Sequence, residues 1–128
     1  MASYKIKSSP WSKIAGFYRD MIEENGHSSL KPMLKFVEQI EAAEFSNRIY
    51  GATSHVRLLI SYLPEFDPDK QVLFVEFDST TRQVKFEYQE TQSPLYKRWR
   101  KACSPKDSFA VFQRFLKRVK WFYSSRPD

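Results

Sequence analysis

Three stretches between residues 55 and 89 place an apolar side chain at every second position, and short polar turns separate them. This alternation is the period of a β-strand, whose successive side chains point to opposite faces of a sheet. Short connections favour antiparallel pairing, so the sequence predicts a meander over residues 55–62, 72–78 and 84–89. The first strand has room to begin as early as Arg48, with Gly51 as a bulge or a bend. One face of this sheet is apolar on every strand, so helices must cover it.

Helical periodicity precedes the strands. Apolar residues three and four positions apart predict a first helix, with Ser9 as its cap and Pro10 in its first position, that ends near Gly26. A second helix is expected over residues 28–43, and the short connection between the two favours an antiparallel helical hairpin. Ahead of the hairpin, residues 4–7 alternate in polarity and predict a short edge strand.

After Pro94 the apolar residues return to helical spacing, which predicts a short helix and then a longer one. The stripe of the short helix consists of Leu95, Trp99 and Ala102. Residues 104–107 have the composition of a helix start, with a serine cap followed by proline, and the last helix is expected to run to about Tyr123. The predicted fold class is α+β. An antiparallel sheet of three or four strands is covered by the N-terminal helical hairpin and the C-terminal amphipathic helix, all within one domain over residues 1–128.

The composition excludes several classes of protein. Hydrophobic residues make up 41% and charged residues 28%, which is typical of a globular chain and not of a disordered one. Cys103 is the one cysteine, so it forms no internal disulfide, as expected in a reducing compartment. No stretch approaches the ~18 apolar residues of a membrane span, and the first residues contain no signal-peptide run. We therefore expect a cytoplasmic protein without membrane contact.

Positive charge is concentrated in the last part of the chain. Residues 1–91 contain 11 basic and 13 acidic side chains, whereas residues 92–128 contain 10 basic and 2 acidic ones. A basic region of this density is a candidate surface for a polyanion. On the helices expected there, the basic residues and one tryptophan lie opposite the apolar side. The candidate anion-binding residues are Lys97, Arg98, Arg100, Lys101, Arg114, Lys117, Arg118 and Trp121.

This basic region has two interpretations. Clustered lysine and arginine side chains neutralise phosphates and release counterions, and an exposed Trp121 would stack on an unpaired base. The alternative is the solvated polar side of an amphipathic helix, because basic residues also favour helix C-termini. The sequence leaves both interpretations open.

Other polar groups have a simpler structural explanation. Residues 53–55, Thr-Ser-His, would place an acid or base beside two hydroxyl groups, but a surface histidine is favoured because no partner carboxylate can be assigned to His55. Five carboxylates would suit Mg²⁺, yet Asp-Pro-Asp is ordinary turn composition, so no metal site and no cofactor are expected. These carboxylates are Glu65, Asp67, Asp69, Glu76 and Asp78.

The expected order of elements resembles that of the bacterial RelE/ParE-type toxins, which have a short strand, a helical hairpin, a three-strand meander and a C-terminal helix. The YKIK start at residues 4–7 and the strand at residues 57–62 carry this resemblance, which covers most of residues 3–90. It implies a metal-independent ribonuclease whose basic and tyrosine side chains act on messenger RNA in the ribosome. The long basic C-terminal region departs from that pattern.

Three function classes follow from the sequence. The first is a non-enzymatic binding module that engages RNA, single-stranded DNA or an acidic protein through the basic C-terminal helical face. The second is a small ribonuclease of the toxin-like topology, using Arg57, His55 or nearby tyrosines. The third is an inhibitor similar to an immunity protein or an antitoxin, which would bind another protein and no nucleic acid.

Overall fold

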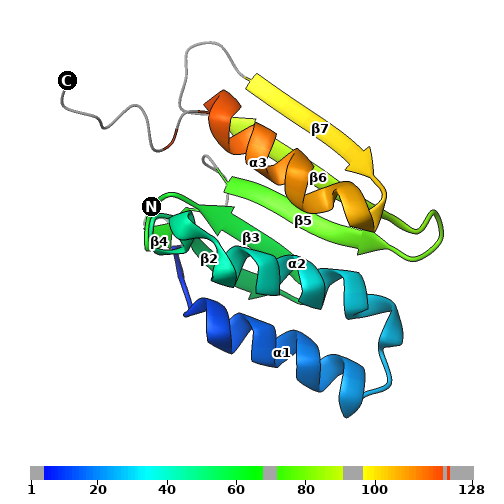
Figure 1. Cartoon of the computed structure of the whole chain (residues 1–128). Coiled ribbons are helices and arrows are strands. Elements are labelled where there is room, and N and C mark those ends of the chain that lie inside the picture. The colour runs from blue at the N-terminus through cyan, green and yellow to red at the C-terminus, as the bar shows by residue number, and fades with distance from the viewer. Residues whose placement is uncertain (1–4, 68–71, 91–96, 120, 122–128) are drawn as a thin grey trace.

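The computed structural model describes residues 5–67, 72–90, 97–119 and 121, and these residues form an α+β fold with two antiparallel sheets. The main sheet has the strand order β2-β3-β5-β6-β7, and the second sheet pairs β1 with β4. The strands of the main sheet are β2 (Tyr50–Ser54), β3 (Arg57–Ser61), β5 (Val72–Asp78), β6 (Gln83–Glu90) and β7 (Lys97–Cys103). The second sheet consists of β1 (Ile6–Lys7) and β4 (Glu65–Phe66), and the helices are α1 (Trp11–Glu23), α2 (Lys31–Ala42) and α3 (Ser108–Val119), as Figure 1 shows.

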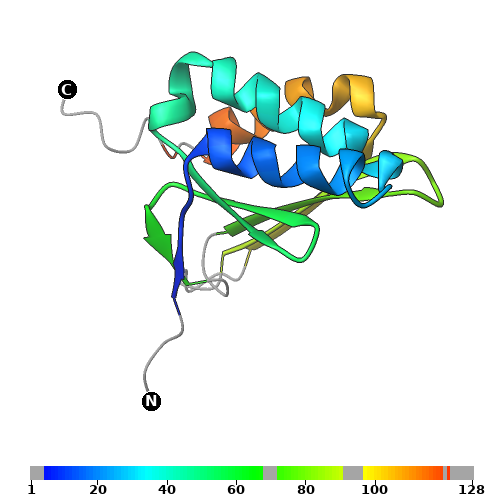
Figure 2. The ribbon, with the colours of Figure 1, turned by 90° about the horizontal axis from the view of Figure 1, so that it is seen from below.

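All three helices lie on one face of the main sheet (Figures 1 and 2), so the expectation that helices cover the apolar face is confirmed. Phe36 of α2 is fully buried at the centre of this layer, and its ring lies 5.9 Å from Phe86 of β6 and 5.4 Å from Phe112 of α3. Burying such aromatic side chains removes a large apolar area from water and is the main source of stability here. The core on this face therefore joins α2 to α3, which the strands separate in the sequence.

The two N-terminal helices begin and end close to the predicted positions. Gly26 adopts a left-handed conformation with φ of +74°, and the next N–H, of His27, donates to the carbonyl of Met21 at 3.0 Å. This is the usual glycine termination of a helix. Ser9, predicted to cap α1, instead uses its backbone N–H to bond the carbonyl of Gly51 at 2.9 Å, and Pro10 takes the cap position.

The strand predicted over residues 55–62 is present as β3, but its extension back to Arg48 is wrong, because residues 50–54 form the separate strand β2 in a hairpin with β3. The register is continuous from Tyr50↔Ser61 to Ser54↔Arg57, which leaves a two-residue turn at His55 and Val56. His55 has a positive φ of 58°, a conformation that reverses the chain tightly. Val56, predicted to face the core, is therefore at the tip of the hairpin and 38% exposed.

Gly51 marks a close contact and not the predicted bulge. It pairs with Ile60 without a break in register. A Cβ atom at this position would lie 2.6 Å and 2.8 Å from two ring carbons of Trp11, so the indole of α1 packs directly on the strand backbone. Glycine is required here because no other residue leaves room for the ring.

The short helix predicted after Pro94 is also wrong, because residues 97–103 form β7 at the end of the main sheet. Residues 91–96 lie outside the described part of the chain. β7 pairs with β6 over seven residues, from Val84↔Cys103 to Glu90↔Lys97, so the main sheet has five strands where three or four were expected. The longer helix is confirmed over Ser108–Val119, and of its predicted extension to Tyr123 only Trp121 is described, in a turn conformation.

Among the described residues, the second face of the main sheet is covered at its β2–β3 end. There the small sheet packs Ile6 and Phe66 against Ala52, Leu59 and Val72. The predicted N-terminal strand thus exists as β1, but it pairs with β4 outside the main sheet. In the described residues, none of the helices has both the length and the apolarity needed to cross a bilayer.

Candidate functional site

β7 divides the predicted basic residues between the two faces of the main sheet. Cross-strand partners lie on the same face, and Lys101 pairs with buried Phe86, whereas Arg100 pairs with Glu87. Lys101 therefore lies on the face that the helices cover, and Arg98 and Arg100 lie on the other face, which we call the open face. β7 is a strand because its backbone completes the edge of β6 and because Trp99 packs its ring 5.0 Å from Phe115.

Four exposed basic residues lie on α3 and on the helix-covered side of β7, and we call them the helix-side basic group: Lys101, Arg114, Lys117 and Arg118. All four are exposed, as the sequence predicts for the α3 residues. In the described part of the chain none of them lies within salt-bridge distance of a carboxylate. Their charges are therefore available to an external anion.

Two members of this group influence the thiol of Cys103. Burial raises the pKa of Cys103, and the negative charge of Asp107 raises it further. The positive charges of Lys101 on β7 and Arg114 on α3 act in the opposite direction and lower it. Both cations therefore lie near the same sulfur atom, although they come from different elements.

Trp121, predicted to be exposed beside the basic residues, is buried. It is only 8% exposed, and its ring lies 5.5 Å from Phe115, 5.6 Å from Tyr62 and 6.1 Å from Tyr88. Its Nε1 has no hydrogen-bond acceptor among the described residues. Because α3 ends at Val119, the indole is released from the helical period and turns into the aromatic core. Stacking of an external base on Trp121 is therefore not available in this conformation.

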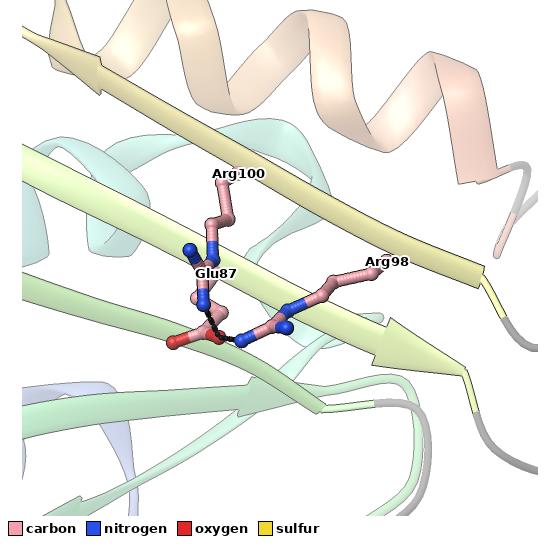
Figure 3. A network of polar contacts seen from close by, with 3 residues as sticks. All are labelled: Glu87, Arg98 and Arg100. Carbon is pink, nitrogen blue, oxygen red and sulfur yellow. Dashed lines mark hydrogen bonds and ion pairs between the residues drawn. The ribbon is translucent and has the colours of Figure 1, made fainter.

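On the open face two arginines converge on one carboxylate (Figure 3). The Nη2 atoms of Arg98 and Arg100 lie 2.8 Å and 3.4 Å from the same Oε2 atom of Glu87. The arginine side chains are 45% and 63% exposed, so solvent reaches both guanidinium groups. Both arginines thus share one acceptor atom at the edge of the sheet. Lys97 begins β7 opposite Glu90, and its backbone position is all that is described.

A groove of about 590 Å³ crosses the open face beside this network. Its floor contains Phe74 of β5, and the guanidinium carbon of Arg57 lies 4.7 Å from the centre of that ring. An arginine at this distance over an aromatic face is a cation–π contact. The charged residues of the open face that line the groove are Arg57, Glu76, Lys85, Glu87 and Arg100. Sequence reasoning missed this site, although the signal was present: Phe74 is an aromatic residue at a position that the alternation assigns to the polar face.

A second hollow of about 500 Å³ lies between the end of α2 and the start of α3. Phe45 and Phe109 stack there, with ring centres 6.2 Å apart and planes at 18°. In the described chain its one charged lining residue is Glu44. This hollow is therefore apolar and separate from the basic residues.

The catalytic and metal alternatives gain no support from the geometry. His55 is exposed at the tip of the β2–β3 hairpin, and the buried hydroxyl of Tyr18 donates to the neighbouring carbonyl of Val56 at 2.9 Å. Burial raises the pKa of Tyr18 well above its usual range, so this hydroxyl stays protonated. Within the described residues, no three His, Cys, Asp or Glu side chains form a group able to hold a metal ion. Asp69, one of the predicted carboxylates, lies outside these residues.

Comparison with known protein families, with curated proteins and with solved structures finds no match to this chain. The RelE/ParE-like topology was inferred for an N-terminal strand beside a three-strand meander. The structure instead places β1 in a separate sheet and adds β2 and β7 to the meander. The resemblance is therefore not supported by the arrangement of the strands.

Proposed function

We propose that this chain is a non-enzymatic binding module for a polyanion. Its contact surface is the edge of the molecule where β7 meets α3. The observation that carries the proposal is the helix-side basic group, whose four exposed cations have no carboxylate partner among the described residues. Unpaired cations on a rigid strand and helix can each replace a condensed counterion on a polyanion.

Residues 97–103 form a strand where a helix was expected, and this geometry also supports the proposed function. A basic helix presents its charges on one side, but a strand presents alternate residues on two faces. Lys101 thus adds to α3, while Arg98 and Arg100 extend the positive surface around the edge to the open face. A flexible chain of phosphates or carboxylates that follows this edge would meet cations on both sides.

The proposal is tested by the salt dependence of binding. Fluorescence anisotropy would be recorded with labelled single-stranded RNA, single-stranded DNA, duplex DNA and polyglutamate over a series of salt concentrations. If the four helix-side cations each contact one phosphate of a single strand, log Kd should change with log salt at a slope of about 3, from about 0.7 per contact. Binding that ignores salt, or no binding at low salt, would contradict the proposal.

Two triple variants distinguish the effect of this surface on affinity from the effect of the total charge. The triple variant with Glu in place of Arg114, Lys117 and Arg118 should no longer bind. Its circular dichroism spectrum should be unchanged, because all three side chains are exposed. The control replaces Lys13, Lys31 and Lys35 by Glu, which changes the total charge equally on the exposed sides of α1 and α2. We expect the control to retain most of its affinity. Equal losses in the two variants would mean that total charge, and not the β7–α3 edge, determines binding.

A further inference from the structure

We propose that the groove on the open face holds one nucleotide of a single-stranded nucleic acid. Arg98 and Arg100 would bind its phosphate, and Phe74 with Arg57 would hold its base. This inference rests on the proposed function and names both the class of polyanion and a second contact site for it. The helix-side basic group alone would accept any flexible polyanion, but the groove adds a ring and hydrogen-bond acceptors that discriminate between polyanions.

The phosphate end of the site is the arginine pair. Glu87 accepts from both guanidinium groups at 2.8 Å and 3.4 Å and so fixes their directions before any ligand arrives. Guanidinium groups have five N–H donors in a planar arrangement that matches phosphate oxygens. Both guanidinium groups are partly exposed, so a phosphate can approach them from the solvent.

The base end of the site is the Phe74 ring. It is partly buried against the small apolar cluster, lines the groove and has the guanidinium carbon of Arg57 4.7 Å above its centre. Aromatic rings and guanidinium planes are the two surfaces on which unpaired bases stack in proteins that bind single strands. Phe74 pairs with Glu87, and Glu87 pairs with Arg100, so the ring and the arginine are two strands apart. At the usual strand spacing this is about 10 Å, which the base and an adjacent phosphate of one strand can span.

The carboxylates in the groove favour a nucleic acid over an acidic peptide. Glu76 and Glu87 repel every polyanion, and an acidic peptide offers side chains that only accept hydrogen bonds. A cytosine or adenine also brings an amino group, which a carboxylate can accept from. The combination of arginines, a ring and carboxylates therefore suits a nucleotide better than a run of carboxylates.

The test compares two labelled single strands with the same length and the same number of phosphates, an oligodeoxycytidine and its abasic analogue. Stacking of one base is expected to make the oligodeoxycytidine bind roughly 5- to 150-fold more tightly than the abasic strand. Phe74→Leu should remove most of this difference while leaving the affinity for the abasic strand unchanged. Phe109→Leu, at a half-buried ring on the helix layer, is the matched control and should keep the difference.

Two further variants keep the test decisive if Phe74→Leu folds poorly. Arg57→Gln removes the planar cation from an exposed position and should reduce the preference for bases. Arg98→Gln together with Arg100→Gln should weaken both strands. Equal affinity for the two strands in the unaltered protein would overturn the groove site and leave the β7–α3 edge standing. Polyglutamate that competes as well as the oligodeoxycytidine would also overturn it, and failure of every strand to bind would overturn both proposals.

Discussion

The two faces of the main sheet are built by the same strands but have opposite chemistry. On the helix-covered face, residues such as Leu58, Val75 and Phe86 are almost fully buried and contact the helices. On the open face, the positions beyond the small apolar cluster under β1 and β4 carry Arg57, Glu76 and exposed arginines, with the half-buried ring of Phe74. The difference indicates that alternate residues have separate tasks: one set holds the fold and the other is available to a ligand. Substitutions on the two faces should therefore change different measurements.

The largest expected effect is the loss of a ring from the covered face. Phe112 is fully buried, with ring centres at 5.4 Å from Phe36 and 6.0 Å from Phe45. Phe112→Ala should lower the free energy of unfolding by about 3–5 kcal/mol, because it removes buried area and leaves a cavity. Phe74→Ala on the open face should cost clearly less. Urea denaturation followed by circular dichroism measures both, and equal losses would break the distinction between the faces.

The next largest change in stability is expected where α1 contacts the covered face of β2. Gly51→Ala would place a methyl group 2.6 Å from the Trp11 ring, so we expect a loss of about 1–3 kcal/mol from overpacking. Gly16→Ala is the matched control, since nothing lies within 4 Å of an added Cβ on α1. An alanine inside a helix should stabilise the protein by about 0.5–1 kcal/mol. The two alanines should thus shift the thermal midpoint in opposite directions.

A smaller effect is expected at the ion pair on the open face. The side chain of Lys85 lies 2.8 Å from Asp78 and, together with the backbone N–H groups of Thr80 and Thr81, lowers the pKa of Asp78 below its ordinary value of 3.8. A carboxyl group with a lower pKa in the folded state stabilises the protein at pH above its unfolded pKa, and this contribution is lost as the pH falls through the folded pKa. Asp78→Asn should therefore be less stable than the unaltered protein at neutral pH. The difference should vanish in acid, and denaturation curves whose separation is independent of pH would contradict this.

The smallest effect on stability is expected at Glu87. Glu87→Gln replaces one exposed charge, so the free energy of unfolding should change by about 0.5 kcal/mol or less. The same change removes the carboxylate that competes for Arg98 and Arg100, and low-salt affinity for single strands should rise by about fivefold or less, the size of an exposed ion pair. Isothermal titration alongside denaturation checks both. Weaker binding would show that the positioning of the arginines outweighs their net charge.

Much of the covered face was predictable from the sequence, because burial imposes a period on the residues that face it. Helical spacing located α1, α2 and α3, and alternation located β5 and β6. The β2–β3 hairpin was missed because its turn lacks the usual asparagine or glycine, and His55 takes the positive φ instead.

The edge of the sheet was less predictable, because tertiary contacts decide its structure. Residues 97–103 have helical spacing at Trp99 and Ala102, but pairing with β6 and packing of Trp99 on Phe115 outweigh that local preference. Trp121 was placed on the exposed side by extending the α3 period beyond Val119, where the helix has already ended. The groove required the register of three strands, since Phe74, Glu87 and Arg100 are distant in sequence and adjacent only in the sheet.

The position of β7 as the outermost strand has a consequence for self-association. An outer strand exposes backbone groups that can pair with the same strand of another copy, which is a common origin of aggregation. In β7 the exposed cations Arg98, Arg100 and Lys101 would face their counterparts in such a pair and repel them. The charges that we propose attract a polyanion would therefore also keep two copies of the chain apart. High salt, which screens such repulsion, would then weaken both effects at the same time.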